Sequence, residues 1–116
     1  MTENNSFSRK RPSFSQFREW FMAAVHKHAA ERTNGPLTRW HSVGSEEQRE
    51  KIIDTFLNDL EVRYGFRPVF QEQLHKLDCP LESVANHIFH VFSTMYLVEH
   101  INAKMYGKAA NNNRVH

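Results

Sequence analysis

Hydrophobic residues recur at helical spacing through the longest uninterrupted segment of the chain, between Cys79 and Gly107. One face carries apolar side chains three or four positions apart, at Leu81, Val84, Ile88, Val91, Met95, Val98 and Met105. Further apolar residues lie on the other faces, at Phe89, Tyr96, Leu97 and Ile101. The pattern predicts one helix of about 26 residues, roughly 39 Å long. A helix that is apolar on most faces needs cover on most faces, so this one predicts a packing partner.

A first helix is predicted before it, from Ser13 to about Arg32. Ser13 and Gln16 have the spacing of a capping box, and Asn34-Gly35-Pro36 is typical of a helix end. Its apolar residues form one stripe, at Phe14, Phe17, Trp20, Phe21, Ala24, Val25 and Ala29.

Two more helices are predicted in the middle of the chain. Ser45 and Gln48 form a second capping-box pattern, and the helix that follows extends to about Tyr64, with Gly65 as its cap. Its inward positions are Ile52, Ile53, Phe56, Leu57 and Leu60. A short helix is then expected from Pro68 to about Leu77, because proline suits the first turn of a helix.

These elements predict an all-α fold, a small bundle of four helices that are antiparallel neighbours because their connections are short. The expected organisation is a disordered basic tail over residues 1–12, one helical domain over 13–107 and a disordered tail over 108–116. No alternating strand pattern persists in the sequence. Leu37 to Gly44 reads as an irregular connector, with Trp40 as an anchor into the core.

Composition restricts the class of protein further. The 116 residues are 40% hydrophobic and 24% charged, close to globular averages. Cys79 is the single cysteine, so no internal disulfide is possible, which suits a reducing compartment. Residues 1–12 lack the apolar core of a signal peptide, and the long helix carries too many polar residues to cross a membrane. We therefore expect a cytoplasmic protein without a membrane partner.

Charge is distributed unevenly along the chain. Residues 1–43 carry a net charge of +4, residues 44–82 carry −4 and residues 83–116 carry +2, when Lys and Arg are counted against Asp and Glu. The ends are thus basic and the centre acidic. Two copies of the chain could complement each other, or the acidic second helix could meet a basic partner.

Histidine is frequent, with eight residues, and His87 and His90 are close enough on one helix to supply two ligands to a metal ion. A closed site needs two further ligands, and no metal-binding motif supplies them, so we predict no metal and no other cofactor. Interface histidines are the alternative. Their protonation below about pH 6.5 would then weaken association.

Glu99 falls within the apolar stripe of the long helix, where a carboxylate is costly unless it is paired. We expect it to pair with Arg18, Arg63 or Arg67, the alternative being a catalytic acid with a raised pKa. The sequence contains no nucleophile elbow and no glycine-rich phosphate loop. The protein is therefore expected not to be an enzyme.

Nucleic-acid binding is the alternative function. Arg9, Lys10 and Arg11, with Arg18 on the first helix, form a basic arm that suits phosphate groups. A helix-turn-helix around Asp78-Cys79-Pro80 is also conceivable, although Glu72 and Glu82 beside it would repel phosphate.

Protein binding agrees best with the pattern as a whole. The shorter helices can cover only part of the long one, and the uncovered side is expected around His90, Leu97 and Ile101, with Trp40 as a further interface residue. We therefore predict a small regulatory or adaptor protein that docks on a larger protein or complex and forms a homodimer. An inhibitor of a nucleic-acid-processing machine is one form that this function can take.

Overall fold

The described part of the chain is all-α, as predicted. The computed structural model describes residues 10–29 and 38–113, with side chains described up to residue 104. It contains three α-helices and two short 3-10 helices, in the order α1 (Phe14–His28), η2 (Trp40–Val43), α2 (Glu46–Tyr64), η3 (Leu74–Lys76) and α3 (Leu81–Asn113). None of the helices in these residues combines the length and the apolarity that a bilayer crossing requires.

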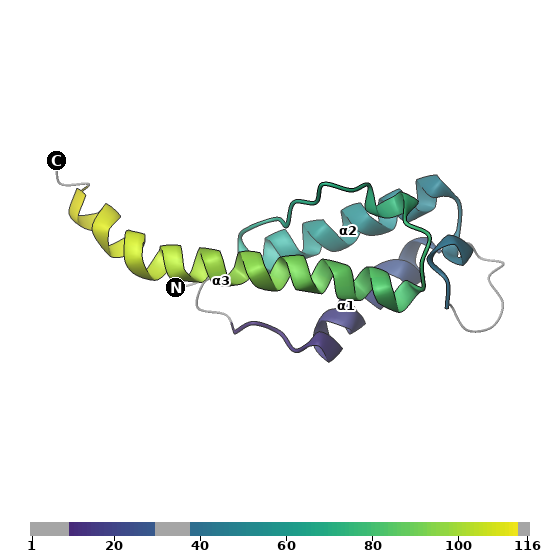
Figure 1. Ribbon diagram of the computed structural model, residues 1–116, viewed down its shortest axis with the longest axis horizontal. Coiled ribbons are helices and arrows are strands. Elements are labelled where there is room, and N and C mark those ends of the chain that lie inside the picture. The colour runs from purple at the N-terminus through teal and green to yellow at the C-terminus, as the bar shows by residue number, and fades with distance from the viewer. Residues whose placement is uncertain (1–9, 30–37, 114–116) are drawn as a thin grey trace.

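The helices α2 and α3 lie parallel to each other, and α1 is antiparallel to both (Figure 1). Two backbone hydrogen bonds join the segment before α2 to the start of α3: Trp40 N donates to Cys79 O at 3.0 Å, and Leu81 N donates to Thr38 O at 2.8 Å. At the other end of α2, the rings of Tyr64 and Phe92 are 5.1 Å apart. The helices α2 and α3 can run parallel because the chain returns along α2 between them.

The predicted third helix from Pro68 to Leu77 is also wrong, because only the η3 turn is helical in this segment. With 19 residues, α2 is about 28 Å long, and residues 66–80 must return along it before α3 can begin. A helix of ten residues would cover only about 15 Å, whereas an extended chain covers about 3.3 Å per residue. The extended path also lets Phe66 stack on Phe92, with ring centroids 5.4 Å apart.

A single aromatic-rich core lies between the three helices. Its largest fully buried side chains come from all of them and from η2: Trp40, Phe17, Phe21, Phe56, Phe92, Ile52, Leu60, Ile88, Val25, Val43 and Val84. The rings of Phe17 and Phe56 meet edge to face at 5.0 Å, a favourable geometry for aromatic pairs. The five inward positions predicted for α2 are all buried, which confirms that stripe.

Local signals set most helix starts, but not all helix ends. Ser45 and Gln48 form the complete capping box at the start of α2, and Gly65 caps its end in the left-handed region at φ 83°. The helix α1 ends at His28 rather than near Arg32, and the predicted stop at residues 34–36 lies outside the described residues. The helix α3 continues through Gly107 to Asn113, because one interior glycine costs only about 1 kcal/mol.

Candidate protein interaction surface

The C-terminal part of α3 extends beyond the rest of the bundle (Figure 1). In its first half, one face is buried, at Leu81, Val84, Ala85, Ile88 and Phe92. Tyr96 still contacts Tyr64, with ring centroids 6.0 Å apart. The three large apolar side chains that follow are exposed, with Leu97 57%, Val98 50% and Ile101 42% accessible. The cover that the other helices provide therefore ends near Tyr96.

Leu97 and Ile101 share one side of α3 with His90. Leu97 and Ile101 are four positions apart and therefore neighbours, and His90 lies two turns before Leu97 on the same side. His90 is exposed as well. Val98 borders this side, although its place in the apolar pattern indicated the core. We call His90, Leu97, Val98 and Ile101 the α3 surface.

Trp40 does not belong to this surface. Its side chain is fully buried, and its indole Nε1 donates a hydrogen bond of 2.8 Å to the carbonyl oxygen of Leu74. The expectation that Trp40 anchors the connector in the core agrees with this position. The prediction that Trp40 is an interface residue is wrong, because a side chain without accessible area cannot contact a partner unless the core opens.

Glu99 is half-buried, and the three arginines considered as its partners bind other carboxylates. Arg18 binds Glu82 at 2.7 Å, Arg63 binds Asp59 at 3.0 Å and Arg67 binds Asp54 at 3.3 Å. The physical reason is that α3 has left the bundle at this point. Water reaches the Glu99 carboxylate, so the cost of burial that predicted a partner does not arise.

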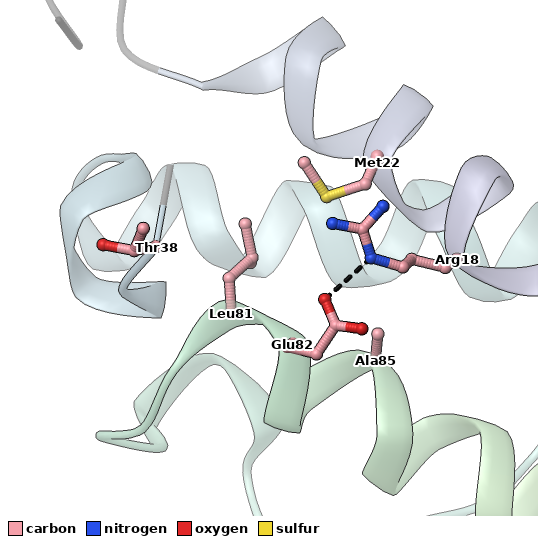
Figure 2. A pocket seen from close by; sticks show the side chains of 6 residues that line it. All are labelled: Arg18, Met22, Thr38, Leu81, Glu82 and Ala85. Carbon is pink, nitrogen blue, oxygen red and sulfur yellow. Dashed lines mark hydrogen bonds and ion pairs between the residues drawn. The ribbon is translucent and has the colours of Figure 1, made fainter. Parts of the chain in front are cut away.

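The predicted basic arm divides into residues with different surroundings. Arg9 lies outside the described residues, whereas Lys10 and Arg11 are exposed. Figure 2 shows Arg18 of α1 directed toward Glu82 of α3 at the mouth of a shallow hollow of about 260 Å³. Met22, Leu81 and Ala85 supply the apolar lining. Because its guanidinium already has an anionic partner, Arg18 is a poorer phosphate ligand than the sequence indicated.

The two histidines proposed as weak metal ligands do not share a site. His87 faces the extended segment, with Nε2 3.3 Å from Glu72 Oε1 and its ring 5.7 Å from that of Phe70. His90 is exposed, one turn further along α3. Among the described residues, no three His, Cys, Asp or Glu side chains lie close enough together to hold a metal ion.

The thiol of Cys79 is half-buried between η3 and α3. Burial raises its pKa, the nearby Arg39 lowers it and Asp78 raises it further, so the net direction is upward. A thiol with a raised pKa stays protonated near neutral pH and is a weak nucleophile. Its position next to Pro80 is that of a small packing residue.

Comparisons with protein-family models, with curated protein sequences and with solved structures find no match to this chain. Its function must therefore be inferred from its own residues. What they define is a small all-α domain with an aromatic core, whose longest helix extends past the bundle and exposes apolar side chains there.

Proposed function

We propose that the protein is a non-enzymatic regulatory or adaptor protein that acts by docking on a larger protein or complex, and that it associates as a homodimer. The observation that carries this proposal is the exposure of Leu97, Val98 and Ile101 on the part of α3 that extends beyond the bundle. A nucleic-acid-processing machine is one class of target that the mixed charge of the chain would suit.

The α3 surface has the form in which helices recognise partners. Ile101 lies three positions after Val98 and four after Leu97, the spacing of apolar anchors that fit a hydrophobic groove or a second helix. Exposed apolar side chains that lie together on a surface mark interaction sites more often than single ones do. Two copies of the α3 surface could meet across a two-fold axis, where each residue of one copy faces its counterpart region in the other.

The experiment is to change Leu97 and Ile101 together to Ser and to measure self-association by sedimentation equilibrium. The change removes the apolar anchors without touching the core. The dissociation constant of the dimer should therefore rise at least about ten-fold, the loss expected for central interface residues. Val62→Ser is the matched control, because Val62 is 82% exposed on α2, away from the α3 surface. Association that is absent in the wild type, or equal in both variants, would contradict the proposed role of this surface.

Nucleic-acid binding remains the alternative outcome. If the protein retards DNA or RNA in a gel and its affinity falls steeply as salt rises, phosphate contacts dominate. Replacing Lys10 and Arg11, which are exposed, by Ala should then abolish the retardation. Unchanged retardation in that variant would exclude the basic arm as the binding element.

A further inference from the structure

A second surface, separate from the α3 surface, lies between α2 and the extended segment 66–77. The two elements border a groove of about 230 Å³. Ile53 and Leu57 of α2 form its apolar floor and are 7% and 6% exposed. Pro68 and Phe70 form the facing wall. The groove can therefore receive an apolar side chain.

Carboxylates surround this apolar floor. Glu46, Glu50 and Asp54 follow one another at i, i+4 spacing along the edge of α2, and Glu72 lies in the facing wall. Like charges at this spacing destabilise a helix by about 0.2–0.5 kcal/mol per pair. Repulsion within the row therefore lowers the stability of α2, and a bound cation would reduce this repulsion.

Basic side chains of the chain itself lie beside most of these carboxylates, but not all. Arg67 lies 3.3 Å from Asp54, His87 lies 3.3 Å from Glu72, and His75 and Lys76 lie 3.5 and 3.8 Å from Glu46. Glu50 is exposed and forms no ion pair with any residue in the described part of the chain. Among the carboxylates that line the groove, Glu50 is thus the one without a partner in the described part of the chain.

We propose that this groove binds a basic segment with an aromatic anchor, and that its occupant is the segment Phe7-Ser8-Arg9-Lys10-Arg11 of a second copy of the chain. The segment carries three positive charges and one aromatic ring within five residues. The groove offers the complementary chemistry, a carboxylate row beside an apolar floor.

The spacing of the side chains in the segment also matches the spacing of the carboxylates along α2. In an extended peptide, alternate residues point to the same side and are about 6.8 Å apart, so Phe7, Arg9 and Arg11 would share one side. Successive members of the carboxylate row, such as Glu50 and Asp54, are about 6 Å apart along α2. With Arg11 at Glu50 and Arg9 at Asp54, Phe7 reaches the part of the floor beside Leu57.

The occupant comes from a second copy because the beginning of α1 and the segment 66–77 lie on opposite sides of α3 (Figure 1). Lys10 and Arg11, which directly precede α1, are exposed and therefore open to another molecule. Mutual exchange of the two segments would close a two-fold dimer. This inference does not depend on the α3 surface, which shares no residue with the groove.

The test is the binding of a fluorescently labelled peptide of residues 1–12 to the full-length protein, followed by anisotropy. We expect saturable binding that Glu50→Lys weakens at least ten-fold, because reversal of this charge places a cation where Arg11 binds. Glu19→Lys, at an exposed position on α1, is the matched control and should change the affinity less than two-fold. Circular dichroism spectra check that both variants keep their helices.

A second peptide tests the apolar anchor. The same peptide with Phe7→Ala should bind about ten-fold more weakly, since it loses the ring that fills the groove. Equal affinities for the two peptides would show non-specific attraction between charges and overturn the proposal. So would equal effects of Glu50→Lys and Glu19→Lys, or no binding at all. Because Leu97 and Ile101 lie elsewhere, their Ser variants should bind the peptide normally, which separates this result from the test of the α3 surface.

Discussion

At the scale of single residues, Arg49 is the most unusual side chain. It is 7% exposed, and it is the buried charged residue of the described core. Its Nε donates to the carbonyl oxygen of His75 and its Nη1 to that of Gly44, both at 2.8 Å. One guanidinium therefore ties the segment before α2 to η3, which helps to hold the facing wall of the groove. No pattern in the sequence marks this role, because both partners are backbone carbonyls.

Arg49→Met should lower the free energy of unfolding by about 2–3 kcal/mol, because a hydrogen bond from a charged donor contributes about 1.5–3 kcal/mol. Methionine retains much of the apolar stem but donates no hydrogen bond. Urea denaturation measures the change, and Lys51→Met, at an exposed position on the same helix, serves as the control. An effect of Arg49→Met no larger than that of the control would mean that the two bonds contribute nothing.

At the scale of elements, the two capped helices begin differently. Ser45 Oγ accepts from Gln48 N at 3.2 Å, and Gln48 Oε1 accepts from Ser45 N at 2.8 Å, which completes the box of α2. Ser13 Oγ accepts from Gln16 N at 3.1 Å, but the Gln16 side chain donates to Glu19 instead of closing a box. The same sequence spacing thus produces a full capping box once and a single capping bond once.

Ser45→Ala should therefore cost about 1 kcal/mol of stability, the usual loss for an N-cap, while Ser13→Ala should cost less. The reason is that the Ser45 change disrupts a reciprocal pair of hydrogen bonds. Thermal unfolding of the two variants in one buffer compares them directly. A larger loss for Ser13→Ala would contradict this ranking.

The extended segment also carries a titratable contact with α3. A hydrogen bond from the backbone N–H of Glu72, and then the neighbouring His87, lower the pKa of the Glu72 carboxyl. A carboxyl whose pKa is lower in the folded than in the unfolded protein stabilises the fold at pH values above its unfolded pKa. This contribution is lost as the pH falls through the folded pKa.

Glu72→Gln should consequently reduce the acid sensitivity of the protein. Between about pH 5 and pH 3, the free energy of unfolding should fall less in the variant than in the wild type. The two values should differ most above the ordinary glutamate pKa of 4.5. Urea midpoints measured across this range give the comparison. Because the side chain is exposed, we expect a small difference, and parallel pH curves would show that the contact does not stabilise the fold.

At the scale of the whole molecule, the protein is 59 Å long but only 29 by 22 Å across. Its length comes from α3, whose C-terminal part extends beyond the other helices (Figure 1). The buried core residues of the described chain end at Phe92, with Met95 and Tyr96 packed against them. The proposed docking surface and the core residues thus lie on different parts of one helix.

A chain that ends at Tyr96 should therefore still fold. Its stability should lie within about 1 kcal/mol of the full-length value, because no described side chain after Tyr96 belongs to the core or packs against it, while self-association through the α3 surface should be lost. Thermal unfolding and sedimentation together measure both properties. If the shortened chain fails to fold, the C-terminal part of α3 belongs to the folding unit and the separation is wrong.

The apolar pattern and the capping signals were enough to predict the all-α class, the start of each α-helix and the buried stripe of α2. These features depend on interactions between residues a few positions apart, such as the capping box of Ser45 and the spacing of Ile52 and Phe56. Such interactions can be predicted from the sequence alone. Only the folded structure reveals the extended path of residues 66–80, the burial of Arg49 and the point near Tyr96 where α3 loses its cover. Each of these depends on contacts between distant segments, so the extended path of residues 66–80 had to be known before the exposed surfaces could be located.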